Sequence, residues 1–131
     1  MRLGLFDIAR FESRYQRVAE GVARLTPPNA AILSMQHSGT IRYYASRVTL
    51  RYDLLDPRWL DRAVSDLADA GYRPYLVLED WEVEAFRERF GRLSASGQLD
   101  RSPIVRLWSQ PPVFLYDAQD PSVPPKSIAG R

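Results

Sequence analysis

The sequence predicts a three-layer α/β domain, with helices on both faces of a mainly parallel, Rossmann-like sheet of four or five strands. Two observations favour this fold class. The runs "AAILSM" (30–35) and "YLVLE" (75–79) are almost wholly apolar, as strands buried on both faces are. Helical patterns alternate with the predicted strands, which favours parallel pairing through right-handed crossovers. The expected strand order is 2-1-3-4, with the last strand antiparallel at the edge.

An amphipathic helix is predicted first, over about residues 7–25. Its apolar stripe has alternating spacings of three and four and contains Ile8, Phe11, Tyr15, Val18, Val22 and Leu25. One flank of the same helix carries Arg10, Arg14, Arg17 and Arg24. These arginines could face lipid phosphates or an acidic partner, but the presence of Glu12 and Glu20 favours a solvated surface.

Shorter sequence patterns predict one strand and two helices in the middle of the chain. Residues 48–53 alternate between apolar and polar, which is typical of a strand near a sheet edge. Helices are expected over 56–71 and 79–91, where Asp56 and Asp80 can act as caps. The buried face of the first of these helices is expected to contain Trp59, Leu60, Ala63, Val64 and Leu67.

The C-terminal part is predicted to contain a hairpin of two short strands, 103–108 and 113–117. Residues 1–118 then form a single α/β domain, a size that one core can support. Residues 119–131 have almost no apolar anchor and are predicted to be a flexible tail.

The composition excludes several kinds of site. There is no cysteine and only one histidine, so neither a disulfide partner nor a zinc site is expected. Motifs for dinucleotides, P-loops, serine hydrolases and zincins are absent, so no cofactor, metal or catalytic residue is predicted. Net charge is only +2, which gives little reason to expect a nucleic-acid partner. An acidic metal cluster could be formed by Asp53, Asp56, Glu79 and Asp80. However, Asp56 and Asp80 fit better as helix caps.

Polar side chains follow the predicted parallel strands at their carboxyl ends, the edge where open α/β sheets bind ligands. The candidate ligand-binding residues are Gln36, His37, Ser38, Gly39, Asp53, Glu79, Asp80 and Trp81. If the first and third strands are neighbours, His37 lies near Glu79 or Asp80, and such a carboxylate would raise the pKa of the imidazole. The pair could serve acid–base chemistry or tie two loops together, and the second is favoured.

Two further interpretations concern the same edge. Ser38 and Gly39 could cradle a phosphate at a helix N-terminus, but Ser38 also fits an ordinary N-cap. Three aromatic residues, Tyr43, Tyr44 and Trp81, could stack on a sugar or a base, or could instead pack into the core.

Several stretches resemble the C-terminal region of certain bacterial membrane glycosyltransferases, relatives of the dolichyl-phosphate-mannose–protein mannosyltransferases and of the lipid A aminoarabinose transferases. The stretches are "NAAILSMQHSGTIRYYASRVTLRYDLLDPRWLDRAV", "GYRPYLVLEDWEVEAFRERF" and the closing "LDRSPIVRL" and "VFLYD". The resemblance runs from about Phe6 to Asp117. It implies transfer of a sugar from a polyprenyl-phosphate carrier, with the reacting groups in loops between membrane spans that this sequence does not contain.

Two functions from different classes follow. In the first, the chain is a soluble domain on the extracytoplasmic (periplasmic) face of the bacterial inner membrane. There it would support the membrane-spanning part of a parent glycosyltransferase or bind a sugar or phosphate ligand. In the second, it is a stand-alone α/β ligand-binding or protein-interaction module in the cytoplasm.

Overall fold

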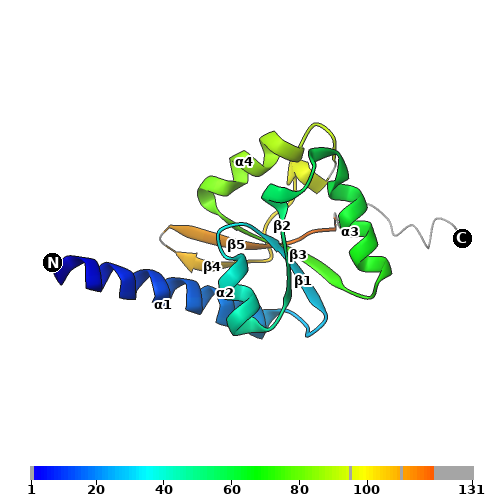
Figure 1. The fold of residues 1–131 in the computed structure, drawn as a ribbon. Coiled ribbons are helices and arrows are strands. Elements are labelled where there is room, and N and C mark those ends of the chain that lie inside the picture. Colours follow the sequence, from blue (N-terminus) through cyan, green and yellow to red (C-terminus); the bar gives the residue numbers. More distant parts are fainter. Residues whose placement is uncertain (1, 95, 110, 120–131) are drawn as a thin grey trace, which may run out of the picture.

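The computed structural model describes residues 2–94, 96–109 and 111–119, with side chains from residue 14 onward. Within these residues the chain forms an α/β domain with four helices and an open, mixed sheet of five strands (Figure 1). The helices are α1 (Arg2–Leu25), α2 (Ser38–Thr40), α3 (Leu60–Asp69) and α4 (Asp80–Phe90). The strands are β1 (Ala30–Ser34), β2 (Val48–Arg51), β3 (Arg73–Glu79), β4 (Val105–Ser109) and β5 (Pro112–Asp117).

The centre of the sheet is as predicted. Strand β1 pairs in parallel with β2 on one side and with β3 on the other. Every residue of β1 is buried, and so is every residue of β3 after Arg73. Strand β2 lies at one edge and is partly exposed, again as its alternating pattern predicts. The apolar runs therefore identify the two central strands correctly.

The other half of the sheet differs from the prediction. Strands β4 and β5 form the expected hairpin, but β5 pairs with β3, antiparallel to it, and β4 takes the edge. The sheet thus has two parallel and two antiparallel pairings, so it is not mainly parallel. Strand β5 takes the inner position because both of its faces are apolar, whereas β4 carries the exposed charge of Arg106.

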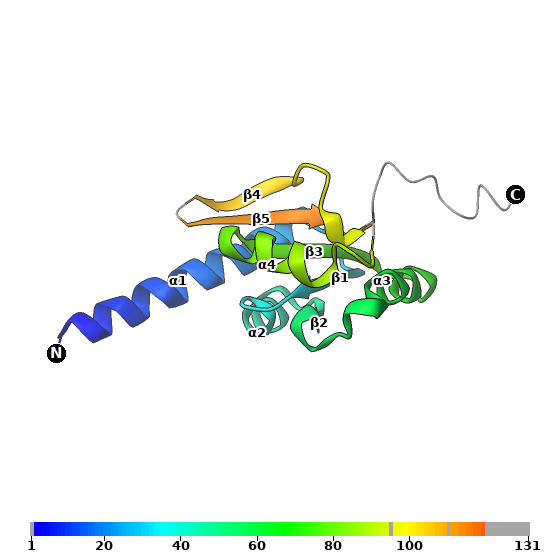
Figure 2. The same cartoon turned by 90° about the horizontal axis from the view of Figure 1, so that it is seen from above.

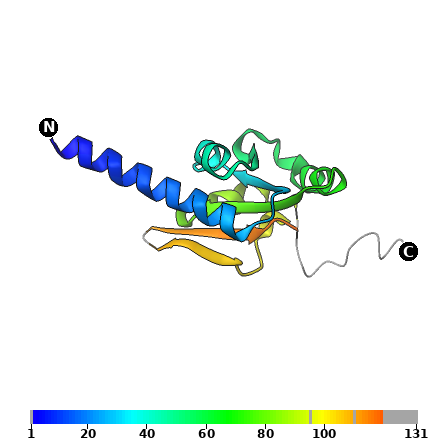
Figure 3. The ribbon, with the colours of Figure 1, turned by 90° about the horizontal axis from the view of Figure 1, so that it is seen from below.

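Helices cover both faces of the sheet (Figures 2 and 3). On one face, α1 and the helical turn 41–45 bury a cluster with the sheet that includes Val18, Val22, Ile32, Ile41 and Val77. On the other face, α3 and α4 bury a second cluster that includes Leu60, Val64, Leu78, Phe86 and Phe90. The two clusters form the core above and below the sheet.

Helix α1 begins at Arg2, earlier than the predicted residue 7. It runs antiparallel to β1, and its N-terminal half extends beyond the carboxyl ends of β1 and β3 (Figure 1). Among the described residues no helix, α1 included, is both long and apolar enough to cross a bilayer. The predicted tail falls almost wholly outside the described residues.

The start of the predicted helix 56–71 also differs in detail. Asp56 caps it as expected, since its carboxylate accepts the N–H of Arg58 at 2.9 Å. However, the first turn (Pro57–Trp59) is a 3-10 helix, and α3 begins only at Leu60. The tighter turn rotates Trp59 away from the core, so this side chain is 45% exposed and not buried as predicted.

Candidate functional site

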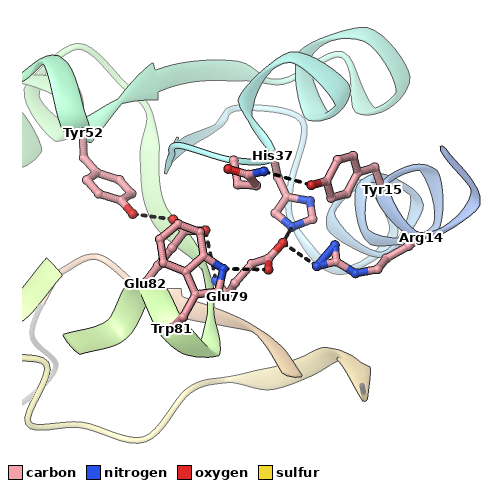
Figure 4. Close-up of polar contacts among 8 residues, drawn as sticks. Arg14, Tyr15, His37, Tyr52, Glu79, Trp81 and Glu82 are labelled. Atoms are coloured by element: carbon pink, nitrogen blue, oxygen red, sulfur yellow. Dashed lines mark hydrogen bonds and ion pairs between the residues drawn. The ribbon is translucent and has the colours of Figure 1, made fainter. Parts of the chain in front are cut away.

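The candidate site lies at the carboxyl ends of β1 and β3, beside the middle of α1. Figure 4 shows that its side chains come from three separate parts of the chain. Helix α1 contributes Arg14 and Tyr15, the turn after β1 contributes His37, and the junction of β3 with α4 contributes Glu79 and Trp81. The predicted proximity of His37 and Glu79 is confirmed.

Glu79 is the centre of this cluster, which we call the Glu79 network. One carboxylate oxygen, Oε2, accepts from Arg14 Nη2 at 2.6 Å and lies 2.8 Å from Nε2 of His37. The other, Oε1, accepts from the indole N–H of Trp81 at 3.0 Å. Burial of Glu79 acts to raise its pKa, but these hydrogen bonds outweigh burial and hold the pKa below its ordinary value. Glu79 is therefore an ionised carboxylate in a buried position.

The imidazole of His37 is wholly buried. Its pKa is lowered, because the desolvation of the charged form outweighs the attraction of Glu79 and the nearby Arg14 adds repulsion. The predicted rise in the pKa of His37 is therefore wrong. Its ring meets that of Tyr15 edge to face, with centroids 4.6 Å apart. A neutral, enclosed imidazole suits a structural role, since no substrate can reach it in this arrangement.

A second buried carboxylate lies three residues further on. Glu82 is fully buried in the first turn of α4, where its Oε1 accepts from the hydroxyl of Tyr52 and its Oε2 faces the backbone N–H of Glu79 at 3.4 Å. Burial raises the pKa of Glu82 to about 7. Burial likewise raises the pKa of Tyr52, and the hydrogen bond to Glu82 adds to that shift.

Glu79 and Glu82 together form a capping box, so Glu79 and not Asp80 is the N-cap of α4. The predicted cap was one residue too late because aspartate is the commoner cap residue. The E-x-x-E spacing of Glu79 and Glu82 was the signal that sequence reasoning missed. Tyr52 and Arg14 were missed as well, because each lies on an element that was expected to be near the surface.

The remaining predicted residues are placed separately. Ser38 is buried and its hydroxyl donates to the carbonyl of Ser34 at 2.9 Å, so it is not an N-cap. Gln36 is exposed and donates to the hydroxyl of Tyr15. Gly39 is also exposed, with open space where a Cβ would stand. Asp53 pairs with Arg51 at 2.6 Å and not with the side chains of the Glu79 network.

The three aromatic candidates are all largely exposed and not packed into the core. Tyr43 is 77% exposed, Tyr44 49% and Trp81 53%. Trp81 differs from the tyrosines because its indole N–H is fixed by Glu79, which leaves part of the ring facing solvent. Trp81, like Gln36, is therefore a predicted site residue that is both held in place and accessible.

Two grooves lie elsewhere on the surface. One is between α1 and β4, and the other runs along the end of α4, and neither is lined by any of the predicted site residues. Among the described residues, no three acidic or histidine side chains come close enough to hold a metal ion. The arrangement at the carboxyl edge is thus a charged, enclosed tie between α1, β1 and β3, with the indole of Trp81 on its outer side.

Comparison of the chain with family models, with curated proteins and with solved structures finds no match to any of them.

Proposed function

We propose that this chain is the soluble, extracytoplasmic domain of a membrane glycosyltransferase that uses a polyprenyl-phosphate sugar. In this proposal the domain is not catalytic and either supports the membrane-spanning part or binds a ligand. We also infer that it is a reduced, three-layer Rossmann-like fold. The parallel order β2-β1-β3 and the helices on both faces favour that description.

One observation carries the proposal. The family resemblance is most specific on four stretches. Three of them, "QHSG", "RYD" and "RPYLVLEDWE", are separate in the sequence but meet at one edge of the sheet (Figure 4), while the fourth, "DPRWLDRA", forms the start of α3 and the turn before it. His37 from the first contacts Glu79 from the third. Tyr52 from the second contacts Glu82, also from the third. Three of the four stretches are therefore joined in one structural unit, which supports the proposal.

The position of α1 favours a role in which the domain supports the membrane-spanning part. Its middle is held to the sheet by Arg14, while its N-terminal half extends past the sheet edge (Figure 1). Because the helix is held at its middle and its N-terminal half projects, that half can contact the membrane-spanning part.

The location can be tested by cell fractionation with an antibody raised against the chain. We expect the antibody to detect a polypeptide several times larger than 15.0 kDa that stays in membranes after alkaline extraction. Protease added to spheroplasts should digest the epitope, since the domain faces outward. A 15.0 kDa band in the soluble cytoplasmic fraction would overturn the proposal and favour the stand-alone module.

The absence of catalysis is tested separately with the isolated chain. Incubation with polyprenyl-phosphate sugars should leave the donor intact, because the only imidazole is buried. Donor turnover that is lost on replacing Asp53, Glu79 and Asp80 would show that the chain is an enzyme.

A further inference from the structure

The groove between α1 and β4, which we call the α1–β4 groove, is separate from the Glu79 network. It has a volume of about 650 Å³ and is lined by Gln16, Arg17, Glu20, Arg24, Leu107 and Trp108. This is the size range of small-molecule sites. Helix α1 approaches β4 closely here, since a Cβ at Gly21 would stand 3.0 Å from the Leu107 side chain. The wall and the rim of the groove therefore come from two well-packed elements.

The charges of the groove are unbalanced. Arg17 and Arg24 are exposed, and neither forms an ion pair or hydrogen bond with another of the described residues. The only carboxylate in the lining belongs to Glu20, which accepts from Gln16 at 3.3 Å. Arg24 is in the last turn of α1, where the helix dipole alone favours a cation, but Arg17 is not. Two cations against one carboxylate leave the groove positive.

The arginine flank of α1 therefore has two parts. Arg14 turns inward to the buried carboxylate of Glu79, whereas Arg17 and Arg24 face the groove. Because they are seven residues apart, these two lie on the same side of the helix, about 10.5 Å apart along its axis. The long side chains of arginine can close over a phosphate between them and bind it through paired hydrogen bonds.

The other lining residues suit a sugar. Trp108 is half-buried and provides an aromatic wall, against which the apolar face of a sugar ring can pack. Glu20 and Gln16 offer acceptors and a donor for hydroxyl groups. A carboxylate between the arginines would repel a bare anion, so it favours a ligand that has hydroxyl groups beside its phosphate.

We propose that the α1–β4 groove binds a phosphorylated sugar, with Arg17 and Arg24 on the phosphate and Trp108 against the ring. The inference deepens the ligand-binding part of the proposed function but depends only on the groove. Fractionation tests the location and the following titration tests the groove, so the failure of one is distinguishable from the failure of the other.

The three tryptophans of the chain make the test direct. Each gives one indole N–H signal in a nitrogen-15 correlation spectrum, and Trp→Phe variants assign the signals. On titration with a hexose 1-phosphate, the Trp108 signal should shift and saturate, while those of Trp59 and Trp81 should stay in place. Unphosphorylated hexose should leave all three unchanged.

Charge variants establish the role of the arginines. Replacing both (Arg17→Gln with Arg24→Gln) should weaken binding roughly 10- to 100-fold, the effect of losing charge-assisted hydrogen bonds. The matched control is Arg42→Gln with Arg92→Gln, which removes the same charge at two exposed positions outside the groove and should bind like the unmodified chain. Spectra of both variants report whether the fold is retained.

Several outcomes would overturn the inference. A Trp108 signal that does not move, equal shifts with unphosphorylated hexose, or equal weakening in the control variant would each do so. Vesicles of phosphatidylglycerol separate a membrane surface from a soluble ligand. If they perturb Trp108 while hexose 1-phosphate does not, the groove contacts lipid head groups and the phosphorylated sugar is wrong.

Discussion

Glu79 and Glu82 are three residues apart at the start of α4, are almost equally buried, and have opposite protonation behaviour. Glu79 is 3% exposed and Glu82 is fully buried. Burial acts to raise the pKa of both, yet that of Glu79 lies below its ordinary value and that of Glu82 rises to about 7. The difference comes from the hydrogen-bond partners, because Glu79 has a guanidinium and an indole N–H, whereas Glu82 has only a phenol and a backbone amide.

The comparison shows what burial of a carboxylate can do in one fold. A buried carboxylate beside a cation links distant elements through its charge, here α1 and β3. A buried carboxylate without a cation holds its proton near neutral pH and acts as a neutral hydrogen-bonding group. Substitutions of Glu79 and of Glu82 should therefore change the free energy of unfolding by different amounts and with different pH dependence.

The largest effect is expected for Glu79→Ala. This substitution leaves Arg14 without its partner and removes the N-cap of α4, and breaking a buried pair typically costs about 3–5 kcal/mol. Urea unfolding at pH 7 measures the change in the free energy of unfolding. Glu84→Ala is the control, since this glutamate is exposed on the same helix and should change stability by less than about 0.5 kcal/mol. Equal losses for both variants would contradict the role given to Glu79.

Glu82→Gln should change the pH dependence of stability. The unfolded carboxyl releases its proton at about 4.5 and the folded one at about 7, so the folded state loses stability as pH rises between these values. Over this interval the free energy of unfolding falls by about 3 kcal/mol, since each pH unit contributes about 1.36 kcal/mol. Glutamine imitates the protonated form at every pH.

The measurement is urea unfolding of both chains at pH 5 and pH 8. His37 contributes the opposite slope in part of this range, but it does so in both chains. The stability of Glu82→Gln relative to the unmodified chain should therefore increase by about 3 kcal/mol from pH 5 to pH 8. If the two chains differ in their free energy of unfolding by the same amount at pH 5 and pH 8, Glu82 is ionised in the folded state.

How much of this could be predicted from the sequence depends on how local the signal is. Strands β1 and β3 were identified because burial on both faces leaves an uninterrupted apolar run. Their adjacency then brought His37 and Glu79 together. The position of β5 was also signalled, since "VFLY" is apolar throughout while β4 contains Arg106. The predicted order 2-1-3-4 is wrong because this difference within the hairpin sets which of its two strands lies inside the sheet.

Other features have no local signal. Arg14 lies on the same flank of the helical pattern as Arg17 and Arg24, but it turns inward to a carboxylate 65 residues away. The direction of the His37 pKa shift depends on how much desolvation opposes the attraction of Glu79. Both quantities are set by packing in three dimensions, so spacing along the chain does not determine them.

A smaller effect is expected for His37→Ala. The imidazole is buried and pairs with Glu79, so its loss should cost about 1–3 kcal/mol at pH 7. Because the folded pKa is lowered, the unfolded chain takes up a proton first as pH falls below 6.5, which destabilises the folded state only while His37 is present. The difference in the free energy of unfolding between His37→Ala and the unmodified chain should therefore become smaller from pH 7 to pH 5. If His37→Ala leaves the free energy of unfolding at pH 7 unchanged, the histidine does not stabilise the Glu79 network.

The smallest effect is expected for Gly39→Ala, which tests the edge of the site that lies outside the Glu79 network. Gly39 is exposed in α2, its φ is not positive, and a Cβ would meet no atom within 4 Å. Alanine has the higher helix propensity, so the variant should be as stable as the unmodified chain or more stable by up to about 1 kcal/mol. Thermal unfolding measures this, with Gly71→Ala as the contrasting control, because Gly71 has a φ of +97° and alanine is strained there. A clear loss of stability at Gly39 would mean that the turn after His37 needs the conformational freedom of glycine, as a phosphate cradle would.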